Sequence, residues 1–530
     1  MDDGKRFLRR ENALPSLRTV LIAGFVLLAP SPAFATTYVV TRTDDPAPGA
    51  CAVGDCSLRE AVLAANAIAG TDTIQLPAGT LAITIGEIVV DQDLVIDGAG
   101  IGTTILHHAL PTLLHVEGAA LALSNLAIDG PPLADDPPQA ILAEAGASLV
   151  LNAVRVPVEG GGVTIQGGSG PTLDMQACGV DYAIVSSTDG TIDIADSRMG
   201  LLVLNQGEID LHMQRTLIDA PAPSIVPAGI AIMTTGDVLV EDTEVAHARQ
   251  GILVQGLPLS SLVFRRLHYH DGSAPLQVIT PTGFTIEDSE FNDNTAVADF
   301  PGAIFAGNGA QANVFGTTFA RNAGNGDTGG AVHLESGAHA LIVNSTFSAN
   351  TFTSAAAGAG ARGAAIGLLG SSANPPQLTL NHVTIVAPTF APVGMEGSAI
   401  GVRGAPANSA TIVFNSILRG SCRFESPLGG SLGNAHGNIE APGHGCGLDD
   451  ATNIEDASIA SLALGALDDH GGPTPTYQPA ANSIAIGAAI ANFCLPSDQR
   501  GYLRPLADGC DAGAVEVDAI DDRIFVDGFE

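Results

Sequence analysis

The sequence predicts an all-β solenoid, because one short pattern recurs along the chain at a fixed period. Segments 285–294, 313–322 and 341–350 share the order apolar residue, two variable residues, small hydroxyl, one variable residue, Phe, two variable residues and Asn. Corresponding positions in the three segments are 28 residues apart. Alternation with period two is typical of strands, and a fixed period of about 20–50 residues is typical of repeat architectures.

The pattern extends to both sides of these segments. Its small or apolar centres are Leu126, Val154, Cys178, Ser197, Thr216, Thr243, Ser289, Thr317, Ser345, Val383 and Ser416. One such unit cannot bury its apolar face alone, whereas stacked units share one core. We therefore expect a right-handed parallel β-helix over about residues 74–420, with ladders of Asn and Ser or Thr between coils. The handedness follows the general rule for parallel crossovers.

The composition suits thin coils with tight corners. Hydrophobic residues make up 46% of the chain, aromatic residues only 4%, and there are 63 glycines. The net charge is −35, which disfavours binding to nucleic acid or to anionic membranes. Lys5 is the only lysine and precedes the mature chain defined below, which excludes Schiff-base chemistry and a P-loop lysine. Solubility, Ca²⁺ binding and a cationic partner remain open roles for the acidic residues.

Residues 1–35 have the layout of a secretory signal peptide. A basic stretch precedes the apolar run Thr19–Ala29, and Ala33-Phe34-Ala35 fits an A-x-A cleavage site. An uncleaved anchor is the alternative. We expect a mature protein that begins near Thr36, is exported by a bacterium and has no transmembrane segment. An oxidising compartment permits disulfides.

Residues 36–73 are expected to close the N-terminal end of the solenoid. Ser57 followed by Glu60 forms a capping-box pattern, and the apolar residues after it predict a short helix. An uncapped solenoid end would expose core and strand edges. Cys51 and Cys56 are close enough to form a disulfide; a metal site is the alternative, although no second cysteine pair lies nearby.

Two further stretches accompany this pattern. Cys56-Ser-Leu-Arg-Glu-Ala61, followed by segments 72–79 and 94–100, resembles the CSLREA domain. This resemblance implies a secreted bacterial protein with β-helix repeats, and it transfers no catalytic residue.

Cys178 takes a small inward position of the repeat, so we expect a buried free thiol.

The C-terminal part has a different character. Residues 421–452 form a Gly-rich loop, in which Cys422 and Cys446 are expected to pair. Residues 453–517, with Asp498-Gln-Arg-Gly501 and Cys510-Asp-Ala-Gly-Ala-Val-Glu516, resemble the choice-of-anchor Q module of bacterial surface proteins, with His470 and Ile486 as departures. Here Cys494 is expected to pair with Cys510. Residues 518–530 are similar to a short tail of secreted proteobacterial proteins.

The best candidate for chemistry is Arg265-Arg266-Leu-His268-Tyr-His270, which places Arg where the repeat expects Ser or Thr. In one register Arg266 stacks between Glu244 and Glu290; in the other, Arg265 stacks between Asp242 and Asp288. By resemblance to β-helix polysaccharide lyases, Arg265, Arg266, Asp242 and Asp288 are the catalytic candidates, and Asp242, Glu244, Asp288 and Glu290 are the Ca²⁺ candidates. The favoured alternative is a charge ladder whose opposite signs neutralise each other.

These observations favour a secreted or cell-surface, monomeric protein with a binding, adhesive or structural role. A polysaccharide or another component of the cell envelope is the expected partner, and Ca²⁺ is the only cofactor that the sequence suggests. The alternative is a polysaccharide lyase or glycoside hydrolase that acts on acidic polysaccharide. An enzyme should gather at least three carboxylates and an Arg or His in one groove, whereas an adhesin should show paired polar ladders.

Overall fold

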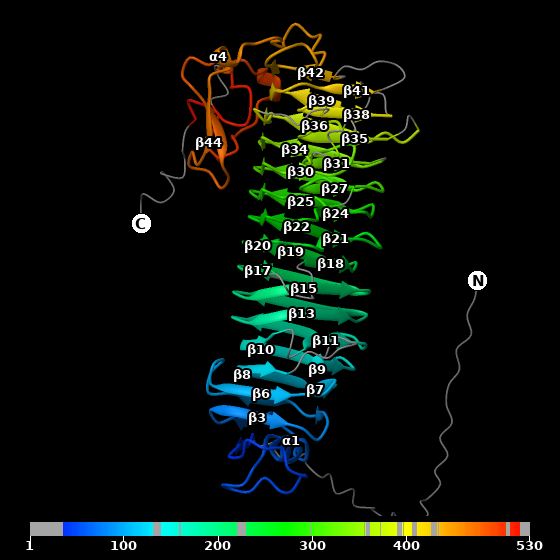
Figure 1. Ribbon diagram of the computed structural model, residues 1–530, viewed down its shortest axis with the longest axis vertical. Coiled ribbons are helices and arrows are strands. Elements are labelled where there is room, and N and C mark those ends of the chain that lie inside the picture. The colour runs from blue at the N-terminus through cyan, green and yellow to red at the C-terminus, as the bar shows by residue number, and fades with distance from the viewer. Residues whose placement is uncertain are drawn as a thin grey trace, which may run out of the picture.

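The molecule is a tall solenoid with a compact C-terminal module beside its last coils (Figure 1). In this computed structural model, residues 35–519 are described except 131–138, 158–160, 220–228, 298, 336, 354–355, 357–360, 371–372, 390–394, 396, 405–410, 426–431, 433 and 505–508. Of the expected signal peptide, residues 1–34 lie outside this range, as do residues 520–530 of the tail. Within the described chain, no helix is long and apolar enough to cross a membrane.

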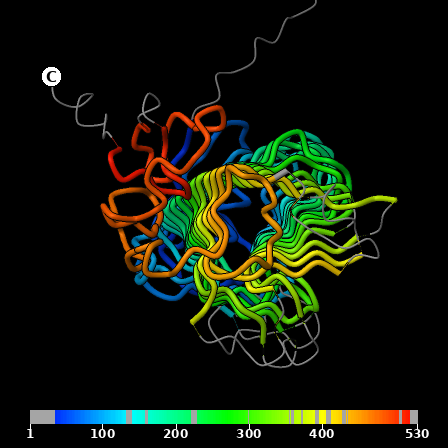
Figure 2. Tube along the Cα trace, turned by 90° about the horizontal axis from the view of Figure 1, so that it is seen from above, coloured from blue at the N-terminus to red at the C-terminus, as the bar shows by residue number. Residues whose placement is uncertain are grey.

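Nearly all strands join one parallel sheet that winds around the axis, so that each coil contributes to three faces (Figure 2). Face A contains β1 (Thr37–Val39), β2 (Asp72–Gln75), β5 (Leu94–Asp97), β8 (Ala120–Asp129), β10 (Ser148–Val156), β12 (Thr172–Gln176), β14 (Asp189–Ala195), β16 (Glu208–Gln214), β19 (Asp237–Glu241), β22 (Ser261–Arg265), β25 (Gly283–Glu287), β28 (Gln311–Phe315), β32 (His339–Val343), β36 (Gln377–Asn381), β39 (Thr411–Phe414) and β42 (Asn434–His436).

Face B follows face A across a sharp corner. It contains the ends of β8 and β10 together with β3 (Gly79–Ile83), β6 (Thr104–His108), β17 (Leu217–Asp219), β20 (Glu244–Ala246), β23 (His268–His270), β26 (Glu290–Asn292), β29 (Thr318–Ala320), β33 (Thr346–Ser348), β37 (Thr384–Val386), β40 (Ile417–Arg419) and β43 (Ile439–Glu440). Two long strands, β13 (Gly179–Ser186) and β15 (Arg198–Asn205), continue from face B into face C.

Face C closes each coil. It contains β4 (Ile88–Val90), β7 (Thr112–Glu117), β9 (Gln139–Glu144), β11 (Gly162–Gln166), β18 (Gly229–Met233), β21 (Gly251–Val254), β24 (Leu276–Val278), β27 (Ile304–Ala306), β31 (Val332–Leu334), β35 (Ile366–Leu369), β38 (Ile400–Arg403) and β41 (Arg423–Glu425). A small pair, β30 (Ala323–Gly324) with β34 (Thr351–Phe352), lies outside the main sheet. The parallel sheet therefore extends from Thr37 to Glu440, beyond the range 74–420 expected from the repeats.

The repeating residues lie inside the coils, as the sequence predicts. Phe319 stacks between Phe291 and Phe347, with ring centroids 5.3 and 4.6 Å away. The asparagines form the expected ladder, in which Asn294 Nδ2 donates to Asn322 Oδ1 at 2.8 Å and Asn322 Nδ2 donates to Asn350 Oδ1 at 3.0 Å. Asn322 Nδ2 also donates to the Phe291 carbonyl of the preceding coil at 2.8 Å. Stacking and hydrogen bonding therefore fix the same register.

The N-terminal end is closed by helix α1 (Leu58–Asn66), whose apolar side is buried against the first coils. Ser57 and Glu60 form the expected capping box. Arg59 is also buried, because its guanidinium pairs with Asp45 at 2.8 Å and donates to the carbonyls of Gly86 and Glu87. The helix thereby holds the first turns of the solenoid through charge as well as through packing.

The expected cysteine chemistry is confirmed. Disulfides join Cys51 to Cys56, Cys422 to Cys446 and Cys494 to Cys510, and Cys178 is a buried free thiol. The first two bridges lie at opposite ends of the parallel sheet. The third lies within the C-terminal module, which also contains α4 (Ile459–Leu462), the antiparallel pair β44 (Leu464–Asp468) and β45 (Thr476–Pro479), and the short 3₁₀ helix η2 (Ala491–Phe493).

The C-terminal module packs against face B of the upper coils. Thr318 Oγ1 donates to the Pro475 carbonyl at 2.6 Å, and Gln499 bridges Thr318 and Thr346 at 2.9 and 2.6 Å. Further along the same column, the backbone N–H of Ala514 donates to Thr384 Oγ1 at 2.9 Å. Face B carries small hydroxyl residues where the module covers it.

We expect Asn322→Ala to destabilise the solenoid, because it removes the buried hydrogen bonds that Asn322 makes to the Phe291 carbonyl and to Asn294 and Asn350. Each buried polar group left unpaired costs about 1–3 kcal/mol. Chemical denaturation of the mature chain, followed by circular dichroism, measures the change. The control is Asn152→Ala on an exposed position of β10, which should shift stability by less than about 0.5 kcal/mol. Equal effects of the two substitutions would contradict a structural role for the ladder.

Candidate functional site

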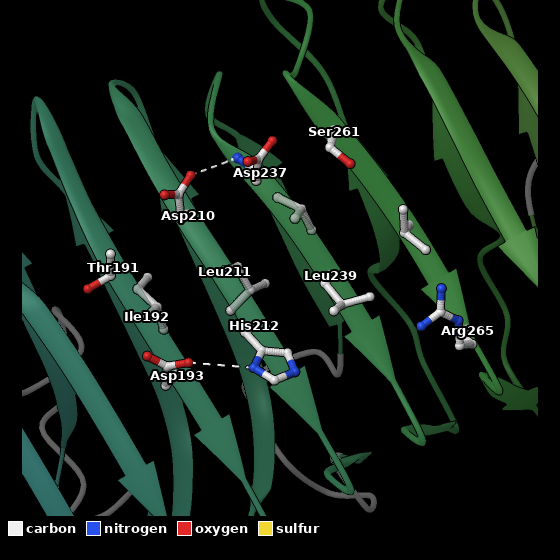
Figure 3. Close-up of a pocket in the computed structure, with 12 residues that line it drawn as sticks. Thr191, Ile192, Asp193, Asp210, Leu211, His212, Asp237, Leu239, Ser261 and Arg265 are labelled. Atoms are coloured by element: carbon white, nitrogen blue, oxygen red, sulfur yellow. Dashed lines mark hydrogen bonds and ion pairs between the residues drawn. The ribbon is translucent and has the colours of Figure 1, made fainter.

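A groove of about 430 Å³ crosses four neighbouring strands of face A, β14, β16, β19 and β22 (Figure 3). It is lined by Thr191, Ile192, Asp193, Asp210, Leu211, His212, Asp237, Val238, Leu239, Ser261, Val263 and Arg265. Inward and outward side chains alternate along each strand, and the outward ones on adjacent coils stand in register. The groove is therefore formed on the flat sheet face by outward side chains, which do not pack in the core.

The polar residues of the groove pair with one another from coil to coil. His212 lies between two carboxylates, with Nδ1 3.6 Å from Asp193 and Nε2 3.3 Å from Glu241. Asp210 accepts a hydrogen bond from the backbone N–H of Asp237 at 2.8 Å. Figure 3 shows Asp210, His212 and Asp237 near the outward Leu239, which together with Val263 gives the groove an aliphatic patch. The arrangement offers hydrogen-bond donors and acceptors on both sides of an apolar surface.

Arg265 lines the end of this groove but is held by acidic neighbours. Its Nε donates to Glu287 at 2.9 Å, and its Nη1 lies 3.7 Å from Glu241. Strand pairing places Arg265 directly between these two glutamates. The expectation that Arg265 stacks between Asp242 and Asp288 is wrong.

Arg266 occupies the corner between faces A and B. Its Nε and Nη2 donate to the two oxygens of Asp242 at 2.5 and 2.7 Å. Asp242, Arg266 and Asp288 all have left-handed backbone, with φ of 48°, 49° and 50°. The expectation that Arg266 stacks between Glu244 and Glu290 is therefore also wrong, because His268 takes that place on face B.

Both errors have one cause. The sequence pattern suggested that an arginine replaces the inward Ser or Thr, whereas Leu267 fills that position and is 1% exposed. Leu267 donates its backbone N–H to Ser289 Oγ at 3.0 Å, as an inward residue of the preceding coil should. The two arginines thus stay on the outside of an unbroken repeat.

The six candidate residues do not converge on one site. Arg265 lines the face A groove, Asp242 and Arg266 lie at the corner, and Glu244 and Glu290 belong to face B. Asp288 instead lines a separate cleft of about 600 Å³ between the corner and the C-terminal module. The cleft's other wall is formed by Gly472, Pro473 and residues 497–501.

At the corner between faces A and B, acidic and basic side chains alternate from coil to coil. The column there runs Asp196, Arg215, Asp242, Arg266 and Asp288, and Arg215 donates to Asp196 at 2.7 Å. Hydrogen bonds from Arg266 lower the pKa of Asp242, and the same bonds raise the pKa of Arg266. A guanidinium held in this way stays protonated and is a poor general base. At Asp288, burial raises the pKa of the carboxyl, with the Glu287 charge as a smaller cause.

The module side of the cleft is built from buried ion pairs. Arg500 donates to Asp498 at 2.7 and 2.9 Å, and Arg504 pairs with Glu516 at 2.7 Å. The N–H of Asp511 also donates to Glu516 at 2.9 Å. The Asp, Arg and Glu residues of this segment therefore have structural partners, which hold the module's loops together.

The groove residues Asp193, Asp210, His212 and Asp237 were not among the sequence candidates. No motif marks them, because outward residues of a solenoid can vary without affecting the core. The signal that could have found them is positional: all four occupy outward places on the alternating strands β14, β16 and β19. Aligning the coils by their inward residues would have brought them together.

Comparison with known proteins supports the architecture. The sequence model for the right-handed beta helix region matches residues 228–419. The fold is a right-handed parallel β-helix. No curated protein matches this chain.

Several solved structures are similar at low identity. A mannuronic acid-specific polysaccharide family 6 lyase from human gut microbiota has a TM-score of 0.39 and 12% identity, covering 77% of this chain and 92% of that one. The A-module of an Azotobacter vinelandii mannuronan C-5 epimerase has a TM-score of 0.33 and 13% identity, covering 65% and 93%. A pectate lyase has a TM-score of 0.25 and 11% identity, covering 91% and 96%. At these values, none of them assigns an activity to this chain.

We expect Arg504→Ala to destabilise the protein by about 3–5 kcal/mol, because Glu516 would remain buried without its partner. Arg266→Ala is the matched control. It removes an ion pair at a partly exposed corner, which typically contributes less than about 1 kcal/mol. Chemical denaturation of both variants measures the difference. A large loss of stability in Arg266→Ala would contradict the description of the corner as a surface charge ladder.

Proposed function

We propose that this protein is a secreted or cell-surface bacterial protein that binds a linear glycan along the face A groove. The observation that carries the proposal is the groove itself, which crosses four coils and in which paired polar groups flank the aliphatic patch of Leu239 and Val263. Coils repeat every ~4.8 Å along the axis, so an extended polymer lying along the axis meets a new set of polar groups at each coil. Ligand sites commonly combine such an apolar surface with a few polar groups.

The charge of the groove favours a neutral or amine-bearing glycan. Asp193, Asp210, Asp237 and Glu241 face or border it, against Arg265 and His212. The whole chain carries a net charge of −35. An acidic polysaccharide would be repelled by this surface unless a cation such as Ca²⁺ lay between them.

Export and surface location are parts of the same proposal. The three disulfides suit an oxidising compartment. The N-terminal signal pattern, the resemblance of residues 56–61 to the CSLREA domain and the resemblance of residues 453–517 to a choice-of-anchor Q module agree with that location. We propose that the protein acts as a monomer and presents its groove to polysaccharide at the cell envelope.

A second candidate, a polysaccharide lyase or glycoside hydrolase, is favoured by one observation. Three aspartates, His212 and Arg265 line a single groove. In such an enzyme, Ca²⁺ held by carboxylates would stabilise charge on a uronate, and His212 would transfer the proton. The pairing of His212 with Asp193 and Glu241 and of Arg265 with Glu287 favours binding over catalysis.

Binding is tested with the purified mature chain on an array of neutral, amino and acidic glycans, followed by calorimetry with the ligand found. Leu239→Arg places a long side chain in the groove without touching the core, and we expect affinity to fall at least about tenfold. Leu341→Arg is the matched control, because it occupies the same outward column four coils further on. Equal affinity in both variants would exclude the groove as the binding site.

Catalysis is tested on the same polysaccharides with and without Ca²⁺. The absorbance of unsaturated uronides reports a lyase, and new reducing ends report a hydrolase. We expect neither signal. Activity that disappears in His212→Ala or Arg265→Ala would replace the binding proposal with the second candidate and place its active site in this groove. Activity unaffected by both variants would place it elsewhere.

A further inference from the structure

A group of histidine, glutamate and asparagine side chains lies on face B, on the coils that precede those covered by the C-terminal module. Strands β20, β23 and β26 carry Glu244, His268 with His270, and Glu290 with Asn292 on their outward sides. In register, His268 lies between Glu244 and Glu290, and His270 lies next to Asn292. This group takes no part in the face A groove.

Two side-chain atoms of this group are shielded from solvent and lack a hydrogen-bond partner. Among the described residues, His268 Nε2 and Asn292 Oδ1 are buried atoms without a hydrogen bond. Both side chains lie against the same carboxylate: Glu290 Oε2 is 3.8 Å from His268 Nε2 and accepts from Asn292 Nδ2 at 3.4 Å. Buried polar atoms are nearly always paired, and orphans call for an explanation such as an ion.

A simple ion pair does not account for the arrangement. The 3.8 Å between His268 Nε2 and Glu290 is too long for a hydrogen bond. The neighbouring His270 differs, since its Nε2 bonds to Glu244 at 3.0 Å and its Nδ1 to Asp271 at 2.8 Å. His270 packs its ring against that of His268, with centroids 4.4 Å apart, and thereby limits the orientations open to His268.

The spacing suits a shared metal ion. Zinc binds imidazole nitrogen and carboxylate oxygen at about 2.0–2.2 Å, so two tetrahedral ligands of one ion lie about 3.4 Å apart. The His268–Glu290 separation needs only a small adjustment to reach this value. Arg321, the arginine whose charge acts on Glu290, is engaged with Asp293 at 2.7 and 2.6 Å.

We propose that His268, Glu290 and Asn292 form a binding site for a divalent transition-metal cation of the zinc type. They supply one imidazole nitrogen, one carboxylate oxygen and one amide oxygen, and a site with three protein ligands leaves a position open for exchange. The imidazole donor disfavours Ca²⁺, which takes oxygen ligands. The side chain of Glu290 is 25% exposed, so an ion can reach the site past it.

Calorimetric titration of the mature chain with Zn²⁺, without a polyhistidine tag, tests the proposal. We expect one site whose affinity falls at least about tenfold in His268→Ala and in Glu290→Gln. The matched control is His107→Ala, which removes another outward histidine of face B, one that pairs with Asp129 at 2.7 Å. The control should bind Zn²⁺ as the unmodified chain does.

Thermal unfolding provides a second readout. Zn²⁺ should raise the Tm of the unmodified chain and of His107→Ala, but not that of His268→Ala, because an ion that binds the folded state stabilises it. Without metal, His268→Ala should not lower the Tm, since it removes an unpaired buried nitrogen. Unchanged Zn²⁺ affinity in both Glu290→Gln and His268→Ala would overturn the proposal, as would Ca²⁺ binding of equal strength at the same residues.

Discussion

The corner between faces A and B is the feature on which the rest of the solenoid depends. At the corners from Asn125 to Asn415, one residue adopts left-handed backbone, which is unfavourable for residues with a Cβ. The next residue points inward, and its hydroxyl donates to the carbonyl two residues earlier: Ser289 to Glu287 at 2.7 Å, Thr317 to Phe315 at 2.9 Å and Ser345 to Val343 at 2.8 Å. The same hydroxyls accept an N–H from the coil before, as Ser345 does from Thr317 at 3.3 Å. The repeated Ser or Thr therefore stabilises the bend and sets the register together.

The hydrogen bonds of the inward Ser or Thr at each corner explain which features could be predicted from the sequence. Inward positions are constrained by the corner and the core, so the columns of Ser or Thr, Phe and Asn recur visibly, and so do the capping box and the cysteine pairs. Where a coil uses Leu267 in place of the hydroxyl, the pattern disappears and the arginines are misplaced by the alignment. The groove residues are subject to neither constraint, so no motif marks Asp193, Asp210 and His212, and only the alignment of whole coils brings them together.

Charge on the surface follows the same geometry. Every coil places its outward residues directly above those of the preceding coil. Each outward side chain therefore has two fixed neighbours, the residues at the same position of the coils before and after it. At the corner the result is alternating Asp and Arg, and on face B it is His between glutamates. Where the C-terminal module covers face B, the outward residues are threonines that bond to the module. The chemical character of each face is thus set coil by coil.

The position of the C-terminal module has a consequence for the order in which the molecule is completed. Its contacts join residues far apart in the chain, with 181 positions between Gln499 and Thr318 and 153 between Gln499 and Thr346. A chain that leaves the ribosome with its N-terminus first can add coils one after another on the capped end. The threonine column stays uncovered until the last segment arrives. The fold is therefore complete only when the whole chain has been synthesised. A truncated chain would expose both the core at its last coil and the threonine column of face B.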